Sequence, residues 1–423
     1  MTAVITGVGV VSAFGDGTRA LFDGLAAGRS GISRIRSFDA STFPTHVAGE
    51  VPAARVTGEL LGSLIDNAPL ATRLADADAL RDRKIAWGLI AAHEAWRDAN
   101  CGDAERDATL VLALGLEQAL LEDFGGIYAN GRIAWERGSP SGVRYRSPVD
   151  LTARAVHELL GLRGPTTVNA SACAAGALAV AHAASLIERG AADIVVCGAA
   201  DSMVNPLGLG GMCRLGAPSP RDELDACRPF DRNRDGLVIG EGAAVFVVEH
   251  EDRAKARGER TYARIVGWGS TQDGYRATAP RPDGAAARRA MQNAIARAER
   301  AGVPVSSIGY INAHGTGTPL NDPAECKAIH GALGDHAHRV AVSSIKGAVG
   351  HLMAASGAIE IAASLLAFER DVLPGTANHR DRDPECDVDV IGERPRNARV
   401  DALLSSSFGF GGQNASVVLG RPR

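Results

Sequence analysis

Aromatic side chains are scarce in this sequence: they account for 4% of its 423 residues, whereas glycine contributes 50. A chain with so much glycine must contain many tight turns and closely packed backbone segments. No apolar run approaches the roughly 20 residues that a membrane-spanning helix needs. The net charge of -4 gives no general electrostatic footprint for nucleic acid. We therefore expect neither a membrane nor a nucleic acid as partner.

Paired cysteines are missing as well. None of the seven cysteines stands in a CxxC pair and their number is odd, which is typical of reduced thiols in a cytoplasm and argues against a zinc site. The N-terminal run MTAVITGVGVVSAFG has no basic residue before Arg19, unlike a secretory signal. These features predict a soluble, cytoplasmic protein without a metal site.

Short apolar strands alternate with helical segments along the whole chain, which predicts layered α/β structure. Two segments resemble each other, GALAVAHAASLIER at 176–189 and GAIEIAASLLAFER at 357–370. Each follows a strand-like run, PTTVNASA in the first case and HRVAVSSIK in the second. The match favours two similar halves, roughly 1–260 and 261–423, with the two equivalent helices side by side at the centre.

Cys173 lies in the stretch NASACAAGALAV, where the neighbouring residues are too small to shield its sulfur and a helix is predicted to begin. The positive end of the helix dipole and its free N–H groups favour a thiolate at such a position. An inert buried cysteine is the alternative for any one of seven cysteines. The other members of a reactive site must therefore be found elsewhere in the chain.

Two histidines offer partners for this cysteine. His314 follows the strand-like run GYINA in the loop HGTGTPLND, and His351 enters the helix equivalent to that of Cys173, with Lys346 five residues before it. If the two halves are equivalent, Cys173 and His351 stand near the facing starts of paired helices. One cysteine, two histidines and a lysine suit acyl transfer better than metal binding, because no second thiolate or carboxylate has the spacing of a ligand.

Two further segments belong to the same region. After the first histidine's loop, Asp322 and Glu325 fit the N-cap and N3 positions of the next helix, with a proline at N1. Near the C-terminus, SSSFGFGGQNASVV (405–418) predicts a glycine-rich turn between two strands, in which Phe408 and Phe410 could close a pocket. No helix follows this turn, so it is a poor phosphate-binding loop.

Five motifs together resemble the β-ketoacyl-ACP synthases, the elongating condensing enzymes of fatty-acid and polyketide synthesis. In family order they are SACAAG around Cys173, RPFDRNRDGLVIGEGAAVFVVE at 228–249, HGTGTPLND, KGAVGH and SFGFGGQN. The resemblance covers the whole chain. It implies the thiolase fold, in which two similar α/β halves form five layers, α-β-α-β-α, and a dimer forms across the first half.

The resemblance also implies the catalytic roles. Cys173 would accept the acyl chain as a thioester, and His314 and His351 would bind the malonyl thioester carbonyl and promote loss of its carboxylate. Lys346 would organise the site chiefly through its charge near His351. Two imidazole donors can stabilise the developing oxyanion without a metal, and removal of one such donor typically costs ~2.7–4 kcal/mol.

Supporting roles follow from the same family. Glu325 and Asp322 would hold the site in shape. Backbone N–H groups of Cys173 and Phe410 would form the oxyanion hole for acyl transfer, and Phe410 with Phe408 would gate the pocket. No cofactor is expected, because the substrates are carried on the phosphopantetheine of an acyl carrier protein.

Departures from the family pattern concern the substrate pocket. Met353 stands where elongating synthases usually carry a small glycine, and in LGLEQALLEDFGG the residues Glu117 and Gln118 replace small ones. Glu117 and Gln118 are expected to narrow or polarise the far acyl pocket, or to reach across a dimer interface to do so. The other residues predicted to line it are Leu116, Thr316 and Thr318.

The expected function is the decarboxylative Claisen condensation of an acyl-enzyme with malonyl-ACP, which yields 3-oxoacyl-ACP in fatty-acid or type II polyketide or polyene elongation. The pocket departures favour a specialised pathway over ordinary elongation of long saturated chains. Besides the acyl carrier protein, the expected partner is a second ketosynthase, in a homodimer or in a heterodimer with a chain-length-factor-like subunit.

Three alternatives share the fold. A thiolase would use a second cysteine in a C-terminal glycine-rich loop, whereas the late Cys386 lies in DPECDVDV without such a loop. A starter-unit synthase would combine Cys, His and Asn, whereas KGAVGH supplies a second histidine. A non-enzymatic chain-length-factor-like partner subunit normally lacks the nucleophile, and Cys173 is present. The condensing enzyme is the hypothesis that these residues favour.

Overall fold

The apolar strands of the chain pair into one mixed sheet, which forms the frame of the molecule. The protein is described by a computed structural model of residues 2–52, 56–116, 128–129, 132–133 and 148–423. Twelve strands belong to the sheet, and β2 (Gly15–Asp16) pairs only with β1 at its side. The other eleven follow in the order β15 (Asp389–Val390), β13 (Ala341–Ser343), β12 (Ile308–Asn312), β17 (Ala402–Gly409), β18 (Gln413–Gly420), β11 (Ala263–Gln272), β1 (Ala3–Ser12), β10 (Glu241–His250), β9 (Ile194–Ser202), β5 (Thr109–Leu114) and β8 (Thr166–Asn169).

The pairing pattern repeats on the two sides of the β1–β11 junction. From the junction outward, β1–β10–β9 are antiparallel and β9–β5–β8 parallel, while β11–β18–β17 are antiparallel and β17–β12–β13 parallel. Only three residue pairs, Ala3–Ile265, Val4–Arg264 and Ile5–Ala263, join β1 to β11. The division of the chain near residue 260 stays a prediction, because this junction makes the two half-sheets continuous.

Two helices lie between the half-sheets, as the repeated segments predict. Helices α6 (Ala175–Glu188) and α12 (Ser356–Ser364) pack against each other at Gly176 and Gly357. A Cβ atom on Gly176 would lie 2.6 Å from the backbone nitrogen of Ala358, and one on Gly357 would lie 2.6 Å from that of Ala177. Only glycine permits so close an approach of the two backbones.

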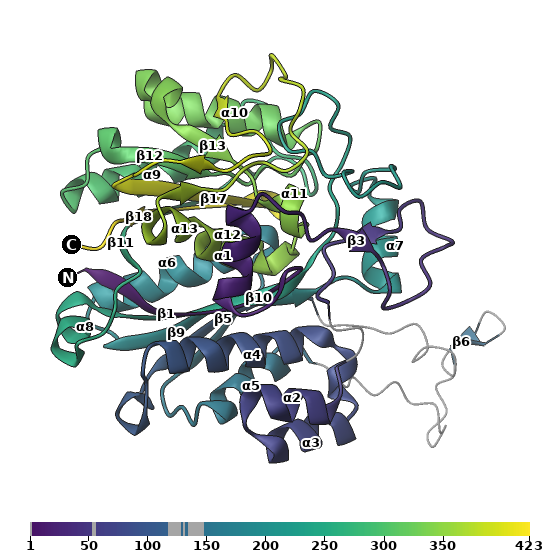
Figure 1. The fold of residues 1–423 in the computed structure, drawn as a ribbon, viewed down its shortest axis with the longest axis vertical. Coiled ribbons are helices and arrows are strands. Elements are labelled where there is room, and N and C mark those ends of the chain that lie inside the picture. Colours follow the sequence, from purple (N-terminus) through teal and green to yellow (C-terminus); the bar gives the residue numbers. More distant parts are fainter. Residues whose placement is uncertain (1, 53–55, 117–127, 130–131, 134–147) are drawn as a thin grey trace.

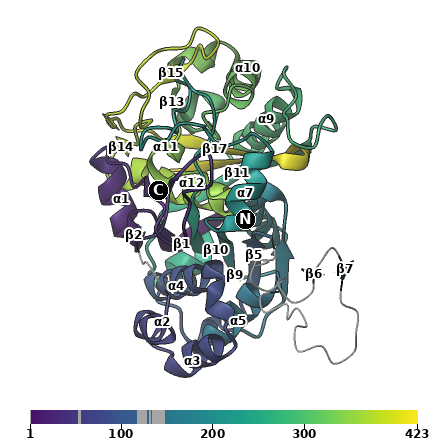
Figure 2. The ribbon, with the colours of Figure 1, turned by 90° about the vertical axis from the view of Figure 1, so that its right-hand side faces the viewer.

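Other helices cover the outer faces, so that the molecule has five layers, α-β-α-β-α (Figure 1). Helix α4 (Arg83–Asp98) packs on β1, β10 and β9, and α9 (Ala285–Arg300) packs on β11 and β18. Figure 2 shows these outer layers at opposite ends of the molecule. The architecture is the thiolase-like fold that the resemblance implied.

Helix α5 (Leu151–Leu159) packs against α4, and α10 (Asn321–Leu333) packs against α9. No helix in the described ranges is both long and apolar enough to cross a membrane. The remaining elements are α1 (Thr18–Ala26), α2 (Gly58–Ile65), α3 (Ala68–Asp76), α7 (Pro206–Arg214), α8 (Glu251–Arg257), α11 (Lys346–Val349), α13 (Leu366–Glu369), β3 (Ser33–Arg34), β4 (Val47–Ala48), β6 (Tyr128–Ala129), β7 (Arg132–Ile133), β14 (Val372–Leu373) and β16 (Arg396–Asn397).

Candidate active site

Cys173 lies on a 3₁₀ turn, Ala172–Ala174, that joins β8 to the central helix α6. Its side chain is buried but faces a cavity of about 380 Å³. Ala172 has φ 48°, in the left-handed region, and Met353 of the second half has φ 46° at the equivalent position, before α12. The two halves thus place the same strained turn before each central helix, and the turn of the first half carries the cysteine.

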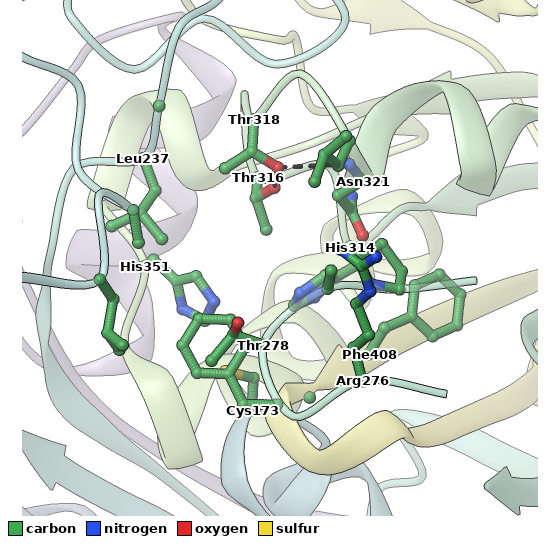
Figure 3. Close-up of a pocket in the computed structure, with 18 of the residues that line it drawn as sticks. Cys173, Leu237, Arg276, Thr278, His314, Thr316, Thr318, Asn321, His351 and Phe408 are labelled. Atoms are coloured by element: carbon green, nitrogen blue, oxygen red, sulfur yellow. Dashed lines mark hydrogen bonds between the residues drawn. The ribbon is translucent and has the colours of Figure 1, made fainter. Parts of the chain in front are cut away.

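Both predicted histidines line the same cavity as Cys173 (Figure 3). His314 follows the end of β12, and His351 follows α11. The centroids of the two imidazole rings are 5.4 Å apart and the rings are nearly perpendicular, at 85°. In Figure 3 Cys173 lies below, between His351 on one side and His314 with Phe408 on the other.

Hydrogen bonds at Nδ1 decide where each histidine carries its proton. Nδ1 of His351 accepts from the backbone N–H of Met353 at 3.1 Å and lies 2.8 Å from Oγ of Ser356. Nδ1 of His314 lies 3.3 Å from Nζ of Lys346, an ammonium that can only donate. Both rings are therefore held as the tautomer with the proton on Nε2. Each offers one N–H donor to a group in the cavity.

The charge state of the two histidines follows from their surroundings. Burial lowers the pKa of His314 well below its usual value, and the charges of Lys346 and His351 lower it further. Burial and the charge of Lys346 lower the pKa of His351 in the same way. Both imidazoles are neutral donors at neutral pH.

Lys346 is buried and forms an ion pair with Glu360. Its ammonium also donates to the carbonyl oxygen of His314. The charge of Lys346 acts on His351, as the resemblance implied, although the direct contacts of its ammonium are with His314 and Glu360. Glu360 also accepts from Oγ of Ser407 at 2.9 Å. Each member of the buried ion pair therefore has a further hydrogen bond, Lys346 to the carbonyl of His314 and Glu360 to Ser407.

Asp322 and Glu325 do not cap the helix as the sequence pattern predicted. Helix α10 already begins at Asn321, and the two carboxylates fold back to the preceding loop. Glu325 accepts from the backbone N–H groups of His314 at 2.8 Å and Gly315 at 2.7 Å. Asp322 accepts from the N–H groups of Thr316 at 3.1 Å and Phe230 at 2.7 Å. These bonds fix the loop that carries the first histidine.

The glycine-rich turn between β17 and β18 closes the cavity over Cys173. Phe408 and Phe410 both line the cavity, and the ring centroid of Phe408 is 5.6 Å from that of His314. A Cβ atom on Gly409 would lie 3.0 Å from the backbone nitrogen of Cys173, so a larger residue would crowd this N–H group. The backbone N–H of Phe410 acts to lower the pKa of the Cys173 thiol.

The sulfur of Cys173 is a thiol in this environment, contrary to the thiolate that the helix start predicted. Burial raises its pKa to about 11, while the charge of Lys346 and the N–H of Phe410 act in the opposite direction. Desolvation outweighs the helix terminus because the sulfur is enclosed by apolar neighbours, among them Met353 and Met212.

The predicted pocket residues separate into three groups. Thr316, Thr318 and Met353 line the cavity, and the hydroxyl oxygens of the two threonines are 2.8 Å apart. Leu116 lies elsewhere: its side chain is 75% exposed and is not among the residues that line the cavity. Glu117 and Gln118 fall outside the described residues.

Sequence reasoning missed three residues that hold the site together. Glu360 is a lone charge in the otherwise apolar helix α12, which is a recognisable signal for a buried partner. Ser356 begins the same helix and contacts His351. Asp201 is the penultimate residue of the buried strand β9 and accepts from the N–H of Ala354 at 2.8 Å, and burial raises its pKa to about 6. In the described ranges no group of three or more His, Cys, Asp or Glu side chains is arranged to hold a metal ion.

Comparison with known families agrees with this geometry. Residues 2–254 match the N-terminal domain of β-ketoacyl synthases, and residues 262–380 match their C-terminal domain. The chain belongs to the β-ketoacyl synthase family. This β-ketoacyl synthase is therefore a condensing enzyme of chain elongation.

Curated relatives of this β-ketoacyl synthase come from both polyketide and fatty-acid synthesis. It is 37% identical to the tetracenomycin polyketide synthase ketoacyl synthase alpha subunit of Streptomyces glaucescens, an alignment that covers 99% of this chain and 97% of the relative. It is 36% identical to 3-oxoacyl-[acyl-carrier-protein] synthase 2 of Coxiella burnetii, with 99% and 98% covered.

Solved ketosynthase structures are similar to this chain over its whole length. The ishigamide ketosynthase/chain length factor is 31% identical and superposes with a TM-score of 0.84, over 100% of this chain and 99% of that one. A type II polyketide ketosynthase in complex with its acyl-carrier protein and bound to the hexaketide is 28% identical, with a TM-score of 0.85 and the same coverage.

Proposed function

We propose that this β-ketoacyl synthase condenses an acyl chain, held as a thioester on Cys173, with a malonyl unit delivered by an acyl carrier protein. The products are 3-oxoacyl-ACP and CO₂. The observation that carries this proposal is the pair of neutral histidines whose Nε2–H groups share one cavity with a cysteine. Such a pair can stabilise an enolate oxygen without a metal ion.

The first step is acyl transfer to the cysteine. The sulfur of Cys173 attacks the carbonyl carbon of an acyl thioester, and its proton passes to the departing carrier thiol. The negative charge on the carbonyl oxygen develops near the backbone N–H groups of Cys173 and Phe410. The lack of a side chain at Gly409 leaves the N–H of Cys173 uncrowded. This pair of donors is our candidate oxyanion hole.

The second step is decarboxylation of the malonyl thioester. Its carbonyl oxygen accepts from Nε2–H of His314 and of His351. The carboxylate leaves as CO₂, and the electron pair of the broken C–C bond forms an enolate whose oxygen charge the two donors stabilise. Because the imidazoles are already neutral, they carry no charge that would bind the malonyl carboxylate in place and oppose its loss.

The third step forms the new carbon–carbon bond. The enolate carbon attacks the thioester carbonyl on Cys173, and collapse of the tetrahedral intermediate expels the cysteine thiolate. Because the pKa of this thiol is about 11, the thiolate takes up a proton from solvent water and returns to the resting thiol. All reacting groups come from the protein and its two thioesters, so we propose that no cofactor takes part beyond the carrier's phosphopantetheine.

Partners and pathway belong to the same proposal. The titles of the similar structures name an acyl-carrier protein and a chain length factor, which supports an acyl carrier protein and a ketosynthase-type second subunit here, in a homodimer or a heterodimer. We propose a cytoplasmic, type II system. The relatives support polyketide and fatty-acid elongation alike.

The proposal is tested by the stoichiometry of one turnover. The protein is mixed with an acyl-ACP and malonyl-ACP labelled with ¹⁴C in its free carboxylate, and products are followed by mass spectrometry. We expect one labelled CO₂ for each 3-oxoacyl-ACP formed. Release of a 3-oxoacyl product with the label retained, or no C–C bond formation with any acyl donor, would contradict the proposal.

A further inference from the structure

Arg276 is the one side chain with a permanent positive charge among the described residues that line the catalytic cavity. The two carboxylates on the cavity wall already have other partners. Asp235 accepts from Oγ of Ser219 and Nε of Arg221, each at 2.7 Å. Asp273 accepts from Nδ2 of Asn414 at 2.8 Å and from a backbone N–H at 3.0 Å. Neither carboxylate forms an ion pair with Arg276.

Among the described residues, the guanidinium of Arg276 has no hydrogen-bond or ion-pair partner. It contacts the ring of the neighbouring Tyr275, whose centroid is 5.4 Å from Cζ, and its side chain is exposed. Figure 3 draws Arg276 on the side of the cavity that His314 and Phe408 occupy. An arginine that lines the catalytic cavity and has no ion-pair partner among the described residues has no evident structural role.

The wall that carries Arg276 is anchored to the glycine-rich turn. The N–H of Gly411 donates to the carbonyl of Ala277 at 2.6 Å, and the N–H of Asp273 donates to the carbonyl of Gly412 at 2.9 Å. These bonds hold the backbone of Arg276 in a fixed place beside Phe408. The long side chain can therefore reach a ligand from a defined point.

The described lining of the cavity offers an entering anion no other cation. His314 and His351 are neutral, and the ammonium of Lys346 is engaged by Glu360 and does not line the cavity. A carboxylate or phosphate that leaves water for a largely apolar cavity loses hydration unless a charged donor replaces it. The planar guanidinium matches the oxygens of either group.

We propose that Arg276 forms an anion subsite for the donor thioester and binds one of its oxyanions, either the carboxylate of the malonyl unit or the phosphodiester of its carrier arm. This inference rests on the proposed function and adds a specificity-determining residue to it. The exposure of the guanidinium keeps the attraction moderate, as the reaction requires, because tight binding of the carboxylate would oppose its loss.

The test uses four small thioesters that separate the two oxyanions. Malonyl and hexanoyl groups are each attached to pantetheine, which has no phosphate, and to phosphopantetheine. For malonyl substrates CO₂ release is measured, and for hexanoyl substrates the acylation of Cys173. We expect Arg276→Gln to lower kcat/KM about tenfold or more for the substrates that carry the recognised oxyanion. A loss of this size corresponds to the loss of one charge-assisted hydrogen bond.

The pattern of losses identifies the ligand. If Arg276 binds the carboxylate, both malonyl substrates lose kcat/KM and both hexanoyl substrates do not. If it binds the phosphate, both phosphopantetheine substrates lose kcat/KM and both pantetheine substrates do not. Arg276→Lys should retain part of the activity in the affected pair, because it keeps the charge without the planar fork.

Arg289→Gln is the matched control. Arg289 is an exposed arginine on α9 that lines a separate groove, so the change removes the same charge outside the cavity. The inference is overturned if Arg276→Gln matches the wild type with all four substrates, or if Arg289→Gln causes the same losses. A wild-type protein that releases no CO₂ from any malonyl thioester or malonyl-ACP would overturn the proposed function as well, and this is seen before any variant is compared.

Discussion

At the scale of single residues, the chemistry depends on which nitrogen of each imidazole carries the proton. The backbone N–H of Met353 and the ammonium of Lys346 both donate to Nδ1 atoms, so Nε2–H is left for the substrate on each ring. A backbone N–H and an ammonium can only donate hydrogen bonds, so the proton of each imidazole stays on Nε2. The two histidines are thereby prepared as hydrogen-bond donors before the substrate arrives.

We expect His314→Ala and His351→Ala each to slow decarboxylation of malonyl-ACP by about 100- to 1000-fold, since each removes one donor from the enolate oxygen. Acylation of Cys173 should survive in part, because its oxyanion donors are backbone N–H groups. Radiolabelled CO₂ release and intact mass measure the two half-reactions separately. A variant that decarboxylates at the wild-type rate would show that its histidine has no such role.

The pH dependence of decarboxylation tests the charge of Lys346. The neutral imidazole is the active form, and both histidine pKa values are lowered, so the wild-type rate constant should not fall from pH 8 to pH 6. Removal of the cation raises both pKa values. The double variant Lys346→Met with Glu360→Gln removes the cation and leaves no unpaired buried charge. In this variant, the pH below which the decarboxylation rate falls should rise toward about 6.5, the ordinary pKa of histidine.

Glu360→Gln alone is the control for this experiment, since it keeps the lysine. In this variant, the pH below which the rate falls should be equal to or lower than that of the wild type. The remaining ammonium is no longer neutralised by a carboxylate and therefore lowers the histidine pKa values at least as much. If the double variant loses activity at the same pH as the wild type, burial alone keeps the histidines neutral.

At the scale of elements, the central pair α6 and α12 places the reactive groups. Each helix follows a 3₁₀ turn with a left-handed first residue, Ala172 or Met353, and the close crossing at Gly176 and Gly357 fixes the distance between the two turns. Cys173 lies on one turn and His351 just before the other. The crossing glycines are therefore structural requirements of the site.

We expect Gly176→Ala to destabilise the protein by about 1–3 kcal/mol, because its Cβ would overlap the backbone of Ala358 and force the helices apart. Urea unfolding followed by circular dichroism measures the change. Gly211→Ala, in helix α7 where no atom lies within 4 Å of the new Cβ, is the control and should be neutral or slightly stabilising. Equal effects of the two substitutions would refute the importance of the crossing.

The paired helices were predictable, because the repeated segments 176–189 and 357–370 are long and share their small residues. The hydrogen-bond partners of Asp322 and Glu325 were not predictable. A capping pattern is local in sequence, whereas these carboxylates accept from N–H groups of the preceding loop, which folds back on them. A local pattern cannot show where a buried carboxylate finds its donors.

At the scale of the whole molecule, neither half of the chain holds the site alone. The first half supplies Cys173, the second supplies both histidines and Lys346, and the cavity forms where the halves meet. The family motifs were sufficient to predict this set of residues from the sequence. The pKa of Cys173 and the exposure of Leu116 were not predictable, since both depend on what packs around a side chain after folding.

The most direct test of the whole account is the identity of the acylated residue. The protein is incubated with a series of acyl-ACPs in the absence of malonyl-ACP, and intact mass followed by peptide mapping locates the acyl group. We predict a single added acyl group on Cys173 in the wild type and none in Cys173→Ala, whose methyl group cannot attack a thioester. Acylation that persists in Cys173→Ala, or that maps to another of the seven cysteines, would contradict the account.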